Sequence, residues 1–457
     1  MSNTEKLTLS LREIAGEANV IDDPEKLKEY AVDGKVPGAV VSPGSIEASS
    51  KILAYAHAKK LTVMPRGKGT KMTMGNPPAR EIDIVISSLR LNKVTDYDTG
   101  NLTLSAQSGL TLGEVQEMLA KEGKGYFLPM DPPFTEGATL GGIVAVNASG
   151  PSRYLYGSAR DLILGIKLVS PDGYIVVSGG KVVKNVTGYD MNKLHIGALG
   201  TLGFICEVTF RLLPLPEEAA TLLIPFKTLD KAGSFIREMV HSSYIPSFIE
   251  IIDGASASKF SSALNVTDGN GYVVAVGLEG VSEAVERQVS DIGNMGKERG
   301  AVEAITLKGE GRDSFAKALR DYSLYLNKDY PNLIVLKSNF TISGFMEMIE
   351  KSERLAEKAG FTVANVCHAG NGILYSYLLI GDEFESKVGA AAEMIEKLRE
   401  EAVKFSGGLV VESTPTLLKE KVSVWGGMRG DYAVMRSLKD TIDPKGIFCP
   451  GRFVESI

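Results

Sequence analysis

The chain has 457 residues, of which 44% are hydrophobic and 23% charged, and its formal net charge is -6. This length suits two domains rather than one, and the composition is that of a globular protein rather than a disordered one. The negative balance offers no basic face for nucleic acid, so a nucleic-acid-binding function is not expected.

The N-terminal residues bear on the location of the protein in the cell, and the cysteines bear on the electron carriers that the chain can hold. Residues 1–6 contain no cationic stretch before an apolar one, and no run of about 18 apolar residues occurs. We therefore expect a cytoplasmic protein that reaches a membrane only through a partner. Cys206, Cys367 and Cys449 are odd in number and far apart, so the sequence has neither a disulfide framework nor a cysteine-rich iron–sulfur motif. Electrons that leave this chain need another carrier.

The first predicted unit is a strand, a helix and a second strand. Val40-Val41 reads as a strand, residues 46–59 as a helix capped by Ser45, and residues 61–64 as a strand. The loop of residues 65–71 follows, with two glycines and three cations, and such a loop can point several backbone N–H groups at phosphate oxygens. Residues 72–78 cannot continue as the helix that a Rossmann fingerprint requires, so that motif is not favoured. A solvated turn remains the alternative for the loop taken alone.

Small residues gather in the next part of the chain. Residues 112–121 read as an amphipathic helix that ends at Gly123. In residues 137–150, the pair Gly141 and Gly142 allows a flat ligand or a second backbone to come very close, and short polar side chains lie around it. A tightly packed helix of small residues under a sheet is the alternative. Residues 162–169 then read as a strand before a turn.

The second half of the chain predicts another α/β layer. Residues 213–216 contain two prolines after an apolar strand pattern and form the best domain boundary. We expect an antiparallel sheet with helices on one face and see no internal repeat. The expected helices span residues 235–241, 281–299, 342–359 and 384–405, and the expected strands span residues 271–277, 333–336 and 373–380.

Together these motifs resemble the FAD-binding type 4 domain of the vanillyl-alcohol oxidase and p-cresol methylhydroxylase superfamily. Residues 182–190 and the Gly-Ala-Leu-Gly-Thr-Leu-Gly run at 197–203 are similar to the FAD-binding subunits of bacterial glycolate oxidase and D-lactate dehydrogenase. The resemblance extends from about Tyr30 to Pro216 and returns at residues 442–451. It covers much of the chain through several ordered motifs.

The resemblance implies a fold, a domain division and a cofactor. The fold would be α+β, with a two-subdomain, PCMH-type FAD-binding domain at residues 1–213 and an α/β cap domain with an antiparallel sheet at 214–410. Residues 411–457 would pack back on the FAD domain. Histidine-tethered relatives carry their histidine in or just after the first phosphate loop, and residues 65–78 contain none, so we expect dissociable, non-covalent FAD. The FAD-binding residues implied are Arg66, Gly67, Lys68, Gly69, Thr70, Lys71, Asp131, Pro132, Gly137, Ala138, Thr139, Gly141, Gly142, Asn147, Ser149, Gly150, Gly157, Arg160, Asp161, Gly203 and Ile205.

His368 is the histidine that best fits a catalytic role among the four in the chain. It follows a strand pattern and opens a glycine loop, where the catalytic 2-hydroxy-acid dehydrogenases of the superfamily carry His-x-Gly-Asp-Gly-Asn-x-His and a later Glu-His-Gly. Those two histidines and the glutamate can hold a divalent metal. Here Tyr375 replaces the second histidine and Glu412-Ser413-Thr414 replaces Glu-His-Gly. Only His368 and Glu412 remain where at least three ligands are usual, so we predict no metal.

The expected chemistry is removal of a hydroxyl proton by a base while the α-hydrogen leaves as hydride for the flavin. His368 is the best base available, Tyr375 would orient it or hold the substrate hydroxyl, and Glu412 completes the catalytic set. Arg429 or Lys71 would hold a substrate carboxylate. A histidine that only satisfies loop carbonyls is the alternative for His368.

Three functions follow from the resemblance. The first is an FAD-dependent dehydrogenase of a small 2-hydroxy acid such as glycolate or D-lactate, which passes electrons to an iron–sulfur or paralogous flavin subunit. The second is a flavin relay or assembly subunit, favoured by Gly-Ala-Leu-Gly-Thr-Leu-Gly in place of the Gly-Ser-Glu-Gly-Thr-Leu-Gly pattern. The third is a stand-alone oxidase that uses O₂.

Overall fold

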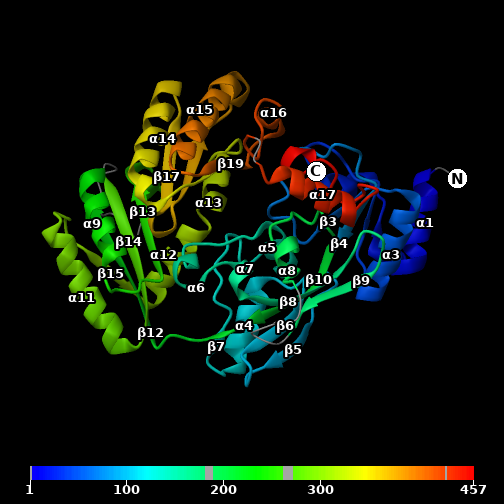
Figure 1. Cartoon of the computed structure of the whole chain (residues 1–457), viewed down its shortest axis with the longest axis horizontal. Coiled ribbons are helices and arrows are strands. Elements are labelled where there is room, and N and C mark those ends of the chain that lie inside the picture. The colour runs from blue at the N-terminus through cyan, green and yellow to red at the C-terminus, as the bar shows by residue number, and fades with distance from the viewer. Residues whose placement is uncertain (1–2, 181–188, 261–270, 428–429) are drawn as a thin grey trace. The chain divides into compact units, whose positions relative to one another are not determined.

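The computed structural model describes residues 3–180, 189–260, 271–427 and 430–457 (Figure 1). Contacts divide the chain into two compact units, one of residues 1–149, 158–215 and 427–457, the other of residues 150–157 and 216–426. The domain limits expected from the sequence stay a prediction. In the described part of the chain, no helix is both long and apolar enough to cross a membrane.

The first unit holds two sheets and a two-stranded ribbon. A four-stranded sheet has the order β1-β2-β4-β3, and β2, β4 and β3 run parallel. A five-stranded antiparallel sheet has the order β5-β6-β10-β8-β9. The strands are β1 (Val20–Ile21), β2 (Ala39–Val41), β3 (Val63–Arg66), β4 (Ile84–Ser87), β5 (Val94–Asp98), β6 (Thr103–Gln107), β7 (Tyr126–Phe127), β8 (Ile163–Val169), β9 (Ile175–Gly179), β10 (Phe204–Arg211) and β11 (Leu213–Pro214).

The helices of this unit begin and end where the sequence provides caps. Ser45 accepts a hydrogen bond from the N–H of Ala48 at 3.1 Å and starts α3, as predicted. Thr111 and Glu114 form a capping box at the start of α4, and Gly123, with φ of 63°, ends it. The helices are α1 (Asn3–Ala15), α2 (Pro24–Leu27), α3 (Ile46–Lys59), α4 (Leu112–Glu122), α5 (Leu140–Val146), α7 (Ala159–Leu162), α8 (Asn192–His195) and α17 (Tyr432–Ile442).

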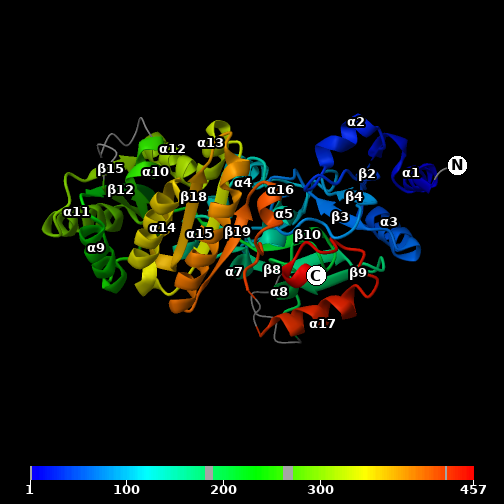
Figure 2. The ribbon, with the colours of Figure 1, turned by 90° about the horizontal axis from the view of Figure 1, so that it is seen from above.

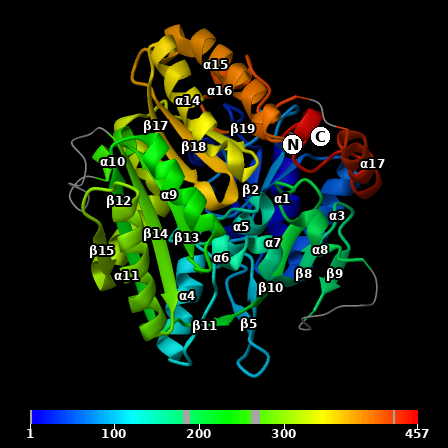
Figure 3. The same cartoon turned by 60° about the vertical axis from the view of Figure 1, so that its left-hand side comes forward.

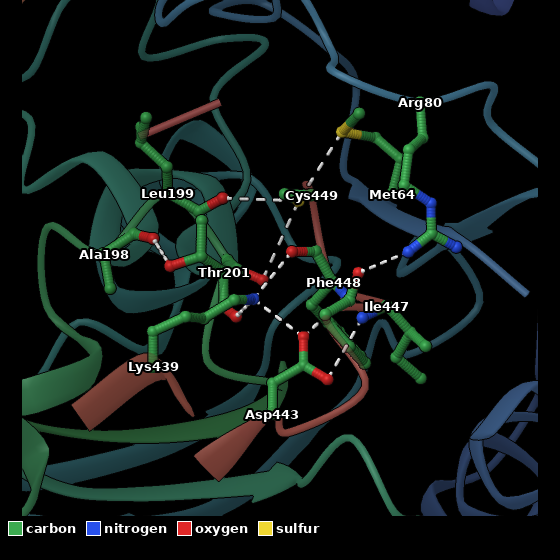
Figure 4. A network of polar contacts seen from close by, with 12 residues as sticks. Met64, Arg80, Ala198, Leu199, Thr201, Lys439, Asp443, Ile447, Phe448 and Cys449 are labelled. Atoms are coloured by element: carbon green, nitrogen blue, oxygen red, sulfur yellow. Dashed lines mark hydrogen bonds and ion pairs between the residues drawn. The ribbon is translucent and has the colours of Figure 1, made fainter. Parts of the chain in front are cut away.

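A buried ion pair fastens the end of the chain inside the first unit (Figure 4). The ammonium of Lys439 donates to Asp443 at 2.7 Å and to the carbonyl oxygens of Thr201 and Phe448 at 2.8 Å each. Asp443 in turn accepts the N–H of Ile447 at 3.1 Å and that of Phe448 at 2.8 Å. Both charged side chains are nearly fully buried. This network ties the loop around Thr201 to α17.

The second unit is built on one eight-stranded antiparallel sheet in the order β15-β12-β14-β13-β17-β18-β16-β19 (Figure 3). Neighbouring strands are joined by continuous ladders, with one register shift between β16 and β19. The strands are β12 (Glu218–Phe226), β13 (Phe248–Asp253), β14 (Tyr272–Gly280), β15 (Ile305–Lys308), β16 (Ile334–Asn339), β17 (Thr362–His368), β18 (Ile373–Leu379) and β19 (Gly408–Ser413).

Helices cover both faces of this sheet. Four long helices, α9, α11, α14 and α15, bury one face in an apolar core (Figure 2), and the shorter α10, α12 and α13 pack on part of the other. The expected antiparallel sheet is confirmed, but the expectation of helices on one face holds only for the four long ones. The helices are α6 (Arg153–Tyr156), α9 (Leu229–His241), α10 (Gly254–Lys259), α11 (Ser282–Glu298), α12 (Gly309–Arg320), α13 (Tyr322–Asp329), α14 (Phe345–Ala359), α15 (Phe384–Lys404) and α16 (Thr416–Lys419), with short 3₁₀ turns elsewhere.

The second unit contains a structural duplication that the sequence did not reveal. Apart from the short α10 between β13 and β14, its first half runs β12, α9, β13, β14, α11 and β15, and its second half runs β16, α14, β17, β18, α15 and β19. In each half the strands lie in the spatial order fourth, first, third, second, read from the outer edge inward. The expectation of no internal repeat was wrong at the level of structure, because the halves share an arrangement of elements rather than a motif.

Candidate functional sites in the two units

A cavity in the first unit is lined by the glycine and lysine loop after β3 and by α5. Its wall includes residues 64–72, residues of α5, Leu199 and Arg452. A second cavity shares Pro65, Arg66, Gly67, Gly142, Ala145 and Leu199 with the first and extends to Gly203 and Ile205. The loop predicted to face phosphates thus lines a cavity, while Lys68 and Thr70 within it are exposed.

Several glycines around this cavity have no room for a side chain. A Cβ added at Gly67 would lie 2.1 Å from Oγ1 of Thr139, and one added at Gly141 would lie 2.8 Å from Cβ of Ser108. Gly69 has φ of +82°, a conformation that side chains disfavour. Oγ of Ser108 is fully buried and has no hydrogen-bond partner among the described residues. These glycines let the loop after β3 and the helix α5 pack closely, and the cavity that they line, with backbone exposed at several glycines, suits a phosphorylated ligand.

The charge of the cavity wall is positive. Arg66 lies over the ring of Tyr30 with 4.6 Å between Cζ and the ring centre, and burial lowers the pKa of its guanidinium. Lys68 and Lys71 stand in the same loop. Arg452 is paired with Asp33 at 2.8 Å and donates to the carbonyl oxygens of Met72, Met74 and Asn76, which holds the loop in place. Such a wall suits a pyrophosphate.

The structure brings together part of the predicted FAD set. The two cavities are lined by Arg66, Gly67, Lys68, Gly69, Thr70, Lys71, Ala138, Thr139, Gly141, Gly142, Gly203 and Ile205. The other predicted residues, which do not line them, are Asp131, Pro132, Gly137, Asn147, Ser149, Gly150, Gly157, Arg160 and Asp161.

Local roles account for several residues of that second group. The side chain of Asp161 accepts the N–H of Ser158 at 2.8 Å, Asn147 ends α5 in a left-handed conformation, and Gly150 and Gly157 belong to the second unit. Residues 182–188 of the predicted flavin motif lie outside the described residues. Sequence reasoning missed the apolar lining, including Met64, Met72, Ile143 and Leu199, because such residues look like core.

A group of charged and aromatic residues lies on one face of the second unit's sheet. In an antiparallel ladder, directly opposed residues point to the same face. Glu250 opposes His368, Val366 opposes Tyr375, and Lys337 opposes Tyr375. Because His368 lies two residues after Val366, the four polar residues Glu250, His368, Tyr375 and Lys337 share a face. This is the face that carries α10, α12 and α13.

Glu250 and His368 form a buried pair at the centre of this group. Both carboxylate oxygens of Glu250 lie 2.6 Å from Nδ1 of His368, and the side chains are 1% and 7% exposed. The ring of Tyr375 meets the imidazole edge-on, with 5.3 Å between ring centres. The alternative of a histidine that satisfies loop carbonyls is therefore wrong for Nδ1, since a carboxylate is its partner.

A lysine lies over the ring of Tyr375, and an arginine acts on that lysine. Nζ of Lys337 lies 5.4 Å from the ring centre of Tyr375. Burial lowers the pKa of Lys337, the carboxylate of Glu412 acts against this shift, and the cation of Arg153 adds to it. Arg153 stands in α6, and a Cβ added at Gly370 would lie 2.4 Å from the ring of Tyr154 in the same helix. The predicted catalytic residues His368, Tyr375 and Glu412 thus share one unit with two cations.

Sequence reasoning missed Glu250, Lys337 and Arg153. The available signal for the first two was a charged residue within a largely apolar stretch, in residues 248–252 and 334–338 respectively. Of the cations that were predicted, Lys71 lies in the first unit and Arg429 lies outside the described residues.

The residues present do not fit the divalent metal of the resembling dehydrogenases. Tyr375 stands where that motif has a second histidine, and Ser413 stands where it has the histidine of Glu-His-Gly, so too few ligand side chains remain. Among the residues that the structure describes, no three His, Cys, Asp or Glu side chains are grouped so that they could hold a metal ion.

Two family models cover most of the chain. The FAD binding domain matches residues 37–179, and the C-terminal domain of FAD linked oxidases matches residues 215–453. The chain belongs to the FAD-linked oxidases. Its cofactor is FAD, as predicted, and it is an FAD-dependent oxidoreductase.

Similar proteins span nearly the whole of this FAD-linked oxidase. Glycolate oxidase subunit GlcD of Bacillus subtilis is 28% identical over 98% of this chain and 97% of its own. D-lactate dehydrogenase of Archaeoglobus fulgidus is 29% identical over 92% and 91%, and D-2-hydroxyglutarate dehydrogenase of Xanthomonas citri is 26% identical over 99% and 98%.

Solved structures confirm the predicted α+β, PCMH-type fold. p-Cresol methylhydroxylase superimposes with a TM-score of 0.80 at 16% identity, over 98% of this chain and 96% of its own. Alkyldihydroxyacetonephosphate synthase superimposes with a TM-score of 0.75 at 20% identity, over 98% and 84%.

Proposed function

We propose that this FAD-linked oxidase oxidises a small 2-hydroxy acid of the glycolate or D-lactate type to the 2-oxo acid. The observation that carries the proposal is the buried Glu250–His368 pair beside Lys337 on one face of the second unit's sheet. A base next to a cation is what a hydroxy acid requires. The activities named for the similar glycolate oxidase subunit and D-lactate dehydrogenase support the same substrate class.

Each residue of the group has a role in this reaction. Nε2 of His368 accepts the proton of the substrate hydroxyl. The ammonium of Lys337 and the guanidinium of Arg153 attract the substrate carboxylate, and the hydroxyl of Tyr375 orients the substrate. Glu412 opposes the loss of charge at Lys337. When bound, FAD supplies the acceptor for the α-hydrogen as hydride.

FAD belongs to the first unit in this proposal. Arg66, Lys68 and Lys71 would face its phosphates, and Gly67 and Gly142, which line both cavities, would let it approach the backbone. The attachment is non-covalent, so acid precipitation of the protein should release all the flavin into the supernatant. Electrons then pass to an iron–sulfur or paralogous flavin subunit, and the cytoplasmic location expected from the sequence stays a prediction.

The second function is a flavin relay or assembly subunit of such a complex. It is favoured by Gly197–Gly203, which lacks the glutamate of the Gly-Ser-Glu-Gly-Thr-Leu-Gly pattern, and by Tyr375 in place of a histidine. Anaerobic mixing of the FAD-loaded chain with D-lactate, L-lactate, glycolate and D-2-hydroxyglutarate in turn separates the two. Bleaching of the flavin band by one acid supports the dehydrogenase. Bleaching by dithionite and by none of the four acids supports the relay subunit.

A further inference from the structure

We propose that Glu250 is a positioning residue that holds the His368 imidazole with Nδ1–H toward its carboxylate, so that Nε2 accepts the substrate proton without the help of a divalent metal. This inference rests on the proposed function and names the device that replaces the metal at the same site.

The backbone fixes the geometry of the pair. Glu250 and His368 are direct partners in the β13–β17 ladder, so the sheet sets the distance between their Cα atoms. The neighbours Cys367 and Ile251 point to the opposite face, into the apolar core under α9, α14 and α15. A slip of one residue in either strand would put the carboxylate and the imidazole on different faces.

The chemistry of the partner selects one tautomer. An ionised carboxylate only accepts hydrogen bonds, so the ring nitrogen that faces it carries the proton. Both carboxylate oxygens lie 2.6 Å from Nδ1, and a neutral imidazole has one N–H. Nε2 therefore has a free lone pair. This is the arrangement in which a carboxylate orients a histidine base and stabilises the imidazolium that forms.

The reaction balances with groups that the chain and its cofactor supply. The hydroxyl O–H bond breaks and its proton forms a bond to Nε2 of His368. The α-C–H bond breaks as the alcohol is oxidised to a carbonyl, and bound FAD would be the acceptor of that hydrogen and its two electrons. The new imidazolium is paired with the carboxylate of Glu250, so the buried pair ends without net charge. No further oxidant or Lewis acid is needed for these steps.

The surroundings are consistent with a closed, metal-free site. The ring edge of Tyr375 lies against the imidazole, where the resembling motif has a second histidine. Lys337 shares this face, and the charges of Glu412 and Arg153 act on its ammonium in opposite directions. A buried ion pair can instead serve only to join two strands, and the experiment is designed to separate these roles.

The test uses the full-length, FAD-loaded protein labelled with ¹⁵N-histidine. Only four histidines occur, and His368→Ala identifies the signal of His368. We expect the wild-type spectrum at neutral pH to show His368 protonated at Nδ1 and not at Nε2. The substitution Glu250→Gln keeps the shape of the side chain and removes its charge. In this variant we expect the tautomer protonated at Nδ1 to be no longer the main one. We expect kcat to fall by about 100-fold with KM changed by less than about threefold.

A matched control tests whether removing any buried carboxylate from this sheet has the same effect as removing that of Glu250. Glu279 lies on the same face of the sheet, its side chain is 7% exposed, and it is paired with Arg312. Glu279→Gln should leave the tautomer of His368 unchanged, and its kcat should stay within about twofold of the wild-type value. Removal of divalent metal with a chelator should leave flavin reduction unchanged.

The outcomes separate this inference from the proposed function. If an acid bleaches the flavin but His368 carries its proton on Nε2, or Glu250→Gln keeps wild-type kcat, the positioning role is overturned while the function stands. If the protein binds a metal stoichiometrically and removal of that metal stops bleaching, the claim that His368 acts without a metal is overturned. If no acid bleaches the flavin, the function fails, and the tautomer in the wild-type spectrum still decides the role of Glu250 even when Glu250→Gln does not fold.

Discussion

Glu250 and His368 lie directly opposite each other on β13 and β17, and 2.6 Å separates the carboxylate from Nδ1 of the imidazole. The two residues are 118 positions apart in the sequence. A carboxylate and an imidazole that are buried at the centre of a sheet need hydrogen-bond partners within the protein. The pair is therefore the natural starting point for predictions about chemistry.

Replacing His368 should stop chemistry without affecting cofactor binding. In His368→Ala the hydroxyl proton loses its acceptor, so the rate of flavin reduction should fall by about 100- to 10,000-fold. The FAD content per chain should stay at the wild-type value, because the predicted FAD loop belongs to the other unit. Stopped-flow absorbance measures both quantities. His241→Ala, at an exposed position, is the control, and an unchanged rate in His368→Ala would remove this residue from the mechanism.

Replacing Lys337 should weaken binding of the substrate carboxylate. Without the ammonium in Lys337→Met, KM should rise by about 10- to 100-fold, the usual value of one hydrogen bond to a charged group. Lys308→Met removes a half-exposed lysine at the edge of the same sheet and should leave KM unchanged. Equal KM values for wild type and Lys337→Met would show that the carboxylate binds elsewhere.

The same lysine should give KM a pH dependence. Burial lowers the pKa of Lys337, so the ammonium loses its proton at a lower pH than the ordinary lysine value of about 10.4. An anionic substrate binds the protonated form, and KM should therefore rise as the pH increases toward that value. A wild-type KM that stays flat on the alkaline side, or that rises equally in Lys337→Met, would contradict this assignment.

A β-branched residue at Gly69 should abolish FAD retention. Gly69 has φ of +82°, and an added Cβ would lie 2.7 Å from Nε of Arg66, so valine strains the loop and displaces one of its cations. Flavin per chain after gel filtration is the measurement. Gly389→Ala, in a helix with open space around it, should keep full flavin and gain up to about 1 kcal/mol of stability. Full flavin in Gly69→Val would remove this loop from the FAD site.

Removing Lys439 should destabilise the first unit. In Lys439→Met, Asp443 is left buried without its counter-ion, and the carbonyl oxygens of Thr201 and Phe448 each lose a hydrogen bond. The free energy of unfolding in urea should fall by about 3–5 kcal/mol. Lys28→Met removes an exposed lysine paired with Glu25 and should cost less than about 0.5 kcal/mol. Equal losses in the two variants would contradict the role of the buried pair.

The parts of the site that the sequence predicted are local ones. Glycines and cations in residues 66–71 lie next to each other in the chain, so their spacing alone indicates a phosphate loop. The caps Ser45 and Thr111 act on N–H groups three residues away, which explains why α3 and α4 follow the expected ranges closely. His368 was found because its motif is also contiguous.

The parts that the sequence did not predict depend on long-range pairing. Glu250 and Lys337 reach His368 and Tyr375 only through the ladders of one sheet, and no local pattern encodes that register. The strands β13 and β17 are buried along nearly their whole length on both faces, so they lack the alternation that marks a strand. The sequence did not reveal the duplication in the second unit, because the two halves share an order of strands and helices and no local sequence motif.

The most direct test of the central claim is anaerobic titration of the FAD-loaded chain with single 2-hydroxy acids, read as absorbance near 450 nm. We predict that glycolate, D-lactate or another small 2-hydroxy acid bleaches the flavin band, and that the corresponding 2-oxo acid appears in equal amount. A flavin that dithionite reduces but that no 2-hydroxy acid reduces would contradict the assignment of this chain as the catalytic subunit.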